Sequence, residues 1–88
     1  MIKSRFTIII SGTECMEANT DFIGNDLRKV PNIPSANACA CECRSEAGCS
    51  VFTWGEISRD CFLKTSDKGR NPYEGAYSGR ADCCEGNR

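Results

Sequence analysis

The chain has 88 residues, of which 40% are hydrophobic and 26% are charged, and its formal net charge at pH 7 is -1. This length and apolar content predict one small domain with a core and exclude a disordered tail. The charge balance argues against general nucleic-acid binding, which needs a large positive excess, and no apolar stretch approaches the roughly 20 residues of a membrane span.

Cysteine is the most informative residue type, because the chain has eight cysteines and no histidine. They are Cys15, Cys39, Cys41, Cys43, Cys49, Cys61, Cys83 and Cys84. An even count at this density in a short chain predicts a disulfide framework. Such bridges persist in an oxidising compartment, so we expect a secreted or extracellular protein.

The first 14 residues differ in character from the rest. They contain one apolar run, residues 6–10, followed by the turn signal Ser11-Gly12. We interpret residues 1–14 as a leader, a linker or an extra strand of a fragment of a larger secreted protein. The domain proper is expected to span residues 15–84, and residues 85–88 form a tail.

A single helix is predicted in the middle of the chain. Gly24-Asn25-Asp26 predicts a bend between short strands, and the helix then follows Ser35, a good N-cap, and ends before Gly48 as the C′ residue. Small residues at helical spacing form one stripe that would let the helix lie close to a sheet. The stripe consists of Ala36, Cys39, Ala40, Cys43 and Ala47.

After the helix the sequence pattern changes to that of strands. Residues 49–54 and 61–65 read as a hairpin of two strands joined by a turn over residues 55–60. Residues 66–75 are polar and contain glycine and proline, so we predict a loop there, followed by a last short strand over residues 76–82. The order predicts an α+β domain in which one helix packs on an antiparallel β-sheet.

The ordered set of motifs resembles the PAN/apple domain family over residues 15–84, about four-fifths of the chain. The matching pieces are Cys15, Gly24-Asn25-Asp26-Leu27, Cys39 with Cys43, Cys49, Phe52-Thr53, Cys61-Phe62-Leu63-Lys64 and Ser78-Gly79. The resemblance implies a small disulfide-rich fold. The eight-cysteine count is most similar to the apple repeats of apicomplexan microneme adhesins.

The same resemblance implies a pairing of the cysteines. It joins Cys39 to Cys61, Cys43 to Cys49, and Cys15 to either Cys83 or Cys84. Cys41 lies about 200° around the helix from Cys39. Because adjacent cysteines rarely bridge each other, we expect Cys41 to pair with whichever of Cys83 and Cys84 remains.

Two other chemistries compete for these residues. The thiolates of Cys39-x-Cys41-x-Cys43 could form a metal cluster, but the chain has neither a CxxC knuckle nor a histidine, so we expect no metal and no cofactor. Without histidine, a nucleophile elbow or a phosphate-binding glycine loop, we also expect no catalytic residue and no enzymatic activity. The carboxylates are scattered among basic residues and read as solvated surface.

The predicted ligand-binding residues lie late in the chain. Trp54, Phe52 and Phe62 are interpreted as core or sheet-covering residues rather than ligand contacts. The loop at residues 66–75 and the strand before it offer charge and an aromatic ring, which could bind sugar hydroxyls or an acidic protein loop. We therefore predict ligand contacts at Lys64, Lys68, Arg70 and Tyr73, against the simpler interpretation that this loop is only solvated.

These observations predict an extracellular, non-catalytic adhesion module that binds protein or carbohydrate. It would be one repeat of a larger secreted adhesin involved in host-cell attachment, as the resemblance implies, and could be stored in a secretory organelle, the microneme. Its partners would be a host-cell surface protein or glycan, or neighbouring repeats of the same chain. The alternative is a structural spacer repeat with no ligand of its own.

Overall fold

The computed structural model describes residues 15–85. Its elements in chain order are β1 (Met16–Phe22), β2 (Asp26–Val30), α2 (Ala36–Ser45), β3 (Val51–Gly55), β4 (Cys61–Lys64), β5 (Arg70–Arg80) and the short 3-10 helix η1 (Ala81–Cys83). The predicted leader, residues 1–14, and residues 86–88 of the predicted tail lie outside the described residues.

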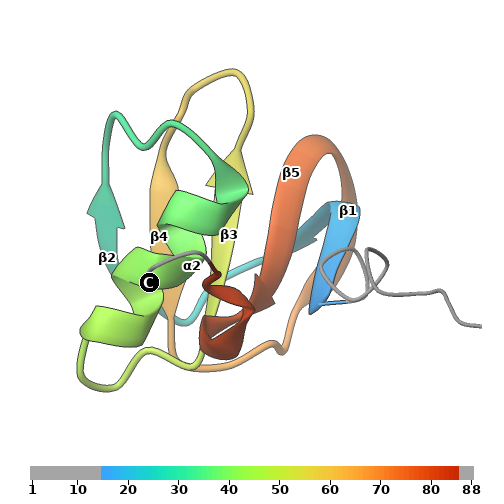
Figure 1. Cartoon of the computed structure of the whole chain (residues 1–88). Helices are drawn as coiled ribbons and strands as arrows, with labels where there is room; N and C mark the ends of the chain where they lie inside the picture. Colours follow the sequence, from blue (N-terminus) through green and yellow to red (C-terminus); the bar gives the residue numbers. More distant parts are fainter. Residues whose placement is uncertain (1–14, 86–88) are drawn as a thin grey trace, which may run out of the picture.

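The five strands form one antiparallel sheet in the order β1-β5-β3-β4-β2, and α2 packs across one face of it (Figure 1). This arrangement confirms the predicted α+β fold with one helix on an antiparallel sheet. None of the described helices is long and apolar enough to cross a membrane.

The sheet curls, because its two edge strands are consecutive in the chain. A bend of only three residues, 23–25, connects β1 at one edge to β2 at the other. The bend is held by hydrogen bonds of 3.0 Å from the Ile23 N–H to the Gly69 carbonyl and from the Thr65 N–H to the Asn25 carbonyl. The face of the sheet opposite α2 is therefore concave at this end.

The helix begins where the sequence predicts but ends earlier. The Ser35 hydroxyl accepts a hydrogen bond of 3.1 Å from the Ala38 N–H, as an N-cap should. The last helical residue is Ser45, and Glu46 is the C-cap in place of a residue next to Gly48. The chain must leave the helix here because Cys43 is bridged to Cys49 only six positions later, and Gly48, with φ of 87°, completes the reversal.

The core lies between α2 and the sheet. Cys39, Cys43, Phe52 and Leu63 are completely buried there. Trp54 packs in the same cluster, and its indole N–H donates a hydrogen bond of 2.9 Å to the carbonyl of residue 33. The tryptophan is thus a core residue with a satisfied polar atom, as the sequence predicts.

The predicted loop over residues 66–75 is wrong from Arg70 onward, because β5 already begins there and runs to Arg80. Its first residues pair with β1, for example Arg70 with Phe22. The glycine that resembled a loop signal marks an irregularity in the ladder instead: Gly75 has φ of 87°, and its N–H donates to the side chain of Asn19 at 3.0 Å. The partner strand, more than 45 residues away in sequence, decides this conformation.

Four disulfides close the structure, and none of the described cysteines is free. The pairs are Cys15–Cys83, Cys39–Cys61, Cys41–Cys84 and Cys43–Cys49. Two of the bridges attach the C-terminal end of the domain. Cys83, the last residue of η1, is bonded to Cys15, the residue before β1. Cys84 is bonded to Cys41 in α2.

Candidate functional site

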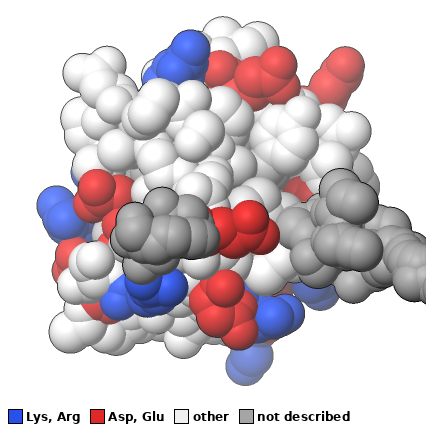
Figure 2. Space-filling model, viewed as in Figure 1, with Lys and Arg blue, Asp and Glu red and all other residues white. Residues whose placement is uncertain are grey.

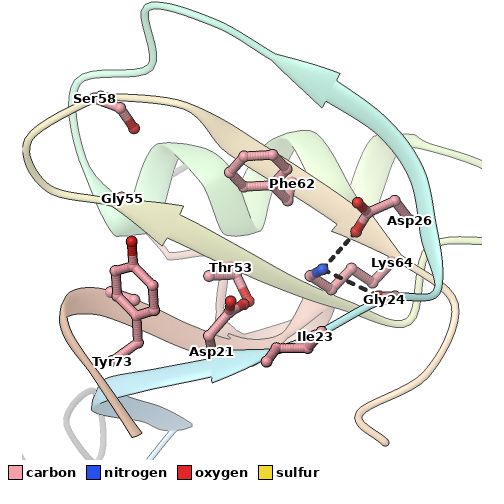
Figure 3. A pocket seen from close by; sticks show the side chains of 11 residues that line it. Asp21, Ile23, Gly24, Asp26, Thr53, Gly55, Ser58, Phe62, Lys64 and Tyr73 are labelled. Carbon is pink, nitrogen blue, oxygen red and sulfur yellow. Dashed lines mark hydrogen bonds and ion pairs between the residues drawn. The ribbon is translucent and has the colours of Figure 1, made fainter. Parts of the chain in front are cut away.

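The face of the sheet opposite α2 contains a pocket of about 390 Å³ (Figure 3). Strand alternation determines which side chains line it, since successive residues of a strand point to opposite faces. On β3, Phe52 and Trp54 are in the core against α2, whereas Thr53 lines the pocket. On β4, Leu63 is in the core, whereas Phe62 and Lys64 line the pocket.

A lysine is buried beside this pocket. The side chain of Lys64 is only 4% exposed, and its ammonium lies 2.5 Å from a carboxylate oxygen of Asp26 and 3.1 Å from the carbonyl oxygen of Gly24 (Figure 3). The ring of Phe62 lies 5.7 Å from the same nitrogen. An ammonium has three donors, so one N–H has no acceptor among the described residues.

The hydroxyl groups beneath the pocket satisfy one another. The oxygens of Thr53 and Ser78 are 2.6 Å apart, and Ser78 donates to the carbonyl of Thr20 at 2.7 Å. The Thr53 hydroxyl therefore donates to Ser78, and it also accepts from the Phe22 N–H at 3.4 Å. This network joins β1, β3 and β5 and supports the base of the pocket.

The walls of the pocket come from other elements. Asp21 and Ile23 lie at the end of β1 and in the bend, and Tyr73 comes from β5 (Figure 3). Ile23 and Tyr73 are 55% and 60% exposed, so their side chains form an open rim. The pocket thus combines a buried ammonium and carboxylates with an open apolar and aromatic rim.

The structure divides the four predicted ligand residues into two groups. Lys64 and Tyr73 both line the pocket, although Lys64 is buried and not part of an exposed surface. Lys68 is exposed and does not line it. Arg70 lies outside it as well, over the ring of Phe22 at 5.0 Å.

Arg70 is engaged in a bidentate ion pair with Glu17, at 2.9 Å and 2.7 Å. The side-chain hydrogen bond and the charge of Arg70 lower the pKa of Glu17, and burial of that carboxyl opposes the shift only in part. The hydrogen bond and charge of Glu17 likewise raise the pKa of Arg70. This geometry gives Arg70 a structural role in joining β5 to β1.

Besides Lys64 and Tyr73, the pocket is lined by residues that the sequence did not predict as ligand contacts, among them Asp21, Ile23, Asp26 and Phe62. A signal existed for Phe62, which shares a strand face with Lys64 by the period of two. No local signal pointed to Asp26, which faces Lys64 only because β2 pairs with β4.

The helix side of the molecule offers a different surface. Figure 2 shows basic and acidic side chains intermingled on that face, without a large patch of either sign. Among the described residues, the one group compact enough to hold a metal ion is Cys15, Asp82 and Cys83. Its two sulfur atoms are joined in a disulfide, so they offer no thiolate to a metal.

The comparisons with known proteins agree with this architecture. Residues 14–87 match the PAN domain family, and the chain belongs to that family. PAN domains are non-catalytic modules that typically bind protein or carbohydrate, and a disulfide-rich PAN domain is consistent with an extracellular location.

A solved structure with the same fold is that of the two N-terminal apple domains of Toxoplasma gondii microneme protein 4. It aligns with a TM-score of 0.55 and 23% identity over 80% of this chain. The alignment covers 41% of that two-domain chain. No curated protein matches the chain.

Proposed function

We propose that the protein is an extracellular adhesion module whose binding site is the pocket on the concave face of the sheet. The observation that carries this proposal is the buried ammonium of Lys64, which retains an unused donor beside an open aromatic rim. Buried polar groups are normally fully hydrogen-bonded, and an exception at a cavity favours a ligand that supplies the acceptor.

The fold similarity to apple domains of a microneme protein supports a finer proposal. The module would be one repeat of a larger secreted adhesin, released from a microneme-type organelle, and its partner would be a protein or glycan on a host cell. Of the residues predicted from sequence to contact the ligand, we retain Lys64 and Tyr73, which line the pocket. We assign Lys68 and Arg70 no part in binding.

A cell-attachment assay with folded variants tests this proposal. Tyr73→Ala and Ile23→Ala remove exposed rim side chains and should reduce attachment of the purified protein to host-type cells by severalfold. Lys68→Ala, at an exposed position outside the pocket, is the matched control and should attach like the wild type. Circular dichroism confirms that each variant is folded.

If only Lys68→Ala lost attachment, the binding site would lie in the segment between β4 and β5 and not in the pocket. If the wild-type protein does not attach and binds nothing on a glycan array or in a cell-surface pull-down, the spacer-repeat alternative is correct.

A further inference from the structure

Negative charge gathers around the pocket. Two further hollows lie at the β3–β4 turn. The first shares Gly55 and Tyr73 with the pocket, and the second shares Glu56 and Glu74 with the first. The carboxylates that line the three hollows are Asp21, Asp26, Glu56 and Glu74, and Lys64 is the one lysine or arginine among their lining residues. Four carboxylates against one ammonium leave an excess of three negative charges.

The excess charge is not neutralised within the described part of the chain. The ammonium of Lys64 is already paired with Asp26. Within residues 15–85, no lysine or arginine forms a salt bridge with Asp21, Glu56 or Glu74. Three carboxylates elsewhere on the molecule are paired with arginine: Glu17 with Arg70, Glu46 with Arg28 and Asp82 with Arg80.

Large apolar side chains stand beside these carboxylates. Ile57, at the tip of the β3–β4 turn, is 93% exposed, and Tyr73 is 60% exposed. Both line the hollow next to the pocket. Lysine and arginine have long aliphatic stems that pack on such surfaces while the charged end reaches a carboxylate, and a cation near an aromatic ring gains further attraction.

We propose that the pocket accepts the arginine or lysine side chain of a protein partner, with its charged end near Asp21, its stem against Tyr73, and a backbone carbonyl of the same segment as the acceptor for the unused N–H of Lys64. The inference rests on the proposed function and names the partner class: a basic segment of a protein. An acidic partner would meet the excess negative charge. A neutral sugar could use the hydroxyl-binding groups but would leave Asp21, Glu56 and Glu74 without a counter-charge.

An NMR titration of the full 88-residue chain, labelled with ¹⁵N, tests this inference. The probes are capped arginine amide, its neutral isostere capped citrulline amide, and capped glutamate amide. Capped arginine should shift amides of pocket residues, such as Gly24, Thr53 and Gly55. Citrulline should bind at least severalfold more weakly, and the arginine shifts should diminish as salt screens the charge.

Matched charge variants locate the effect. Asp21→Asn should weaken arginine binding about two- to fivefold, the range expected for one partly exposed ion pair. Glu42→Gln makes the same charge change on α2, on the opposite side of the sheet, and should leave binding unchanged.

Equal binding of citrulline and arginine, or an unchanged arginine affinity in Asp21→Asn, would overturn the inference. So would an absence of arginine-induced shifts. A panel of neutral methyl glycosides separates this failure from failure of the proposed function: if a glycoside shifts the pocket amides and arginine does not, the pocket is a binding site for sugar and the basic-partner inference is wrong.

Discussion

Lys64 and Asp26 form an unequal pair: the lysine side chain is 4% exposed and the aspartate side chain is 51% exposed. Removing only the carboxylate leaves a buried ammonium with one remaining acceptor, the Gly24 carbonyl. Replacing the lysine by an apolar residue of similar length removes the desolvated charge altogether. The two changes should therefore have different effects on the free energy of unfolding.

We predict that Asp26→Ala lowers the free energy of unfolding by about 1–3 kcal/mol, the cost of a buried polar group without its partner. Lys64→Met should stay within about 1 kcal/mol of the wild type, because an apolar side chain needs no partner. Urea unfolding of both variants measures the difference. Equal destabilisation by the two changes would contradict the unequal burial of the pair.

The ion pair of Glu17 with Arg70 predicts an acid-side effect. The pKa of Glu17 is lowered in the folded protein, so its ionised form contributes stability above the unfolded-state pKa of about 4.3. This contribution is lost as the pH falls through the lower folded-state pKa. The melting temperature of Glu17→Gln should therefore lie slightly below that of the wild type at neutral pH, and the gap should close in acid.

The effect is small because both side chains are about half exposed, 43% and 53%. High salt should reduce the gap at neutral pH in the same way, which makes a salt titration the control. A gap that persists unchanged below pH 3 would mean that Glu17 acts through packing rather than charge.

Among the connecting elements, the bend at residues 23–25 shapes one wall of the pocket and depends on Gly69. A Cβ added at Gly69 would collide with the backbone carbonyl of Ile23, whose N–H bonds to Gly69. Gly48 shares a positive φ, 87° against 83°, but a Cβ there would meet only the side chain of Leu27 at 3.8 Å. Alanine at Gly48 therefore tests backbone strain alone, whereas alanine at Gly69 adds a steric collision.

We predict that Gly48→Ala costs about 1 kcal/mol, the strain of a left-handed non-glycine residue. Gly69→Ala should cost clearly more, because the backbone of the bend has to move, and it should also shift the amides of the pocket wall. Thermal unfolding and a ¹⁵N correlation spectrum measure the two effects. If the two variants were destabilised equally, the backbone of the bend would have to move at little cost in free energy.

At the level of the whole molecule, the bridges Cys39–Cys61 and Cys43–Cys49 should contribute differently to the free energy of unfolding. They close loops with sequence separations of 22 and 6, for which unfolded-state restriction gives about 3.4 and 2.4 kcal/mol. Both sulfurs of the longer bridge are fully buried in the core, so its loss also leaves a packing defect.

The double variant Cys39→Ala/Cys61→Ala should consequently melt at a lower temperature than Cys43→Ala/Cys49→Ala. The intact mass under non-reducing conditions should be eight hydrogens below the reduced mass for the four bridges. Peptide mapping should link Cys41 to Cys84. The reverse melting order would mean that α2 does not depend on its bridge to β4.

Local sequence patterns were enough to predict the helix start and the strand faces, because these depend on residues that are close in the sequence. Ser35 initiates the helix because its hydroxyl caps a neighbouring N–H, and the alternation around Phe52 and Leu63 reflects the period of a strand with one face in the core. The ordered cysteine and strand motifs likewise indicated the PAN family, because a small domain depends on its disulfide framework.

Contacts between distant residues decided the rest. Arg70 begins a strand because β1 supplies its partners, and Lys64 is buried because β2 brings Asp26 against it. The choice between Cys83 and Cys84 follows from where η1 places each residue. The sequence by itself determined the periods, caps and covalent framework, which are properties of neighbouring residues. Strand register and the shape of the pocket needed the tertiary structure, since they arise from pairing between segments that the sequence holds far apart.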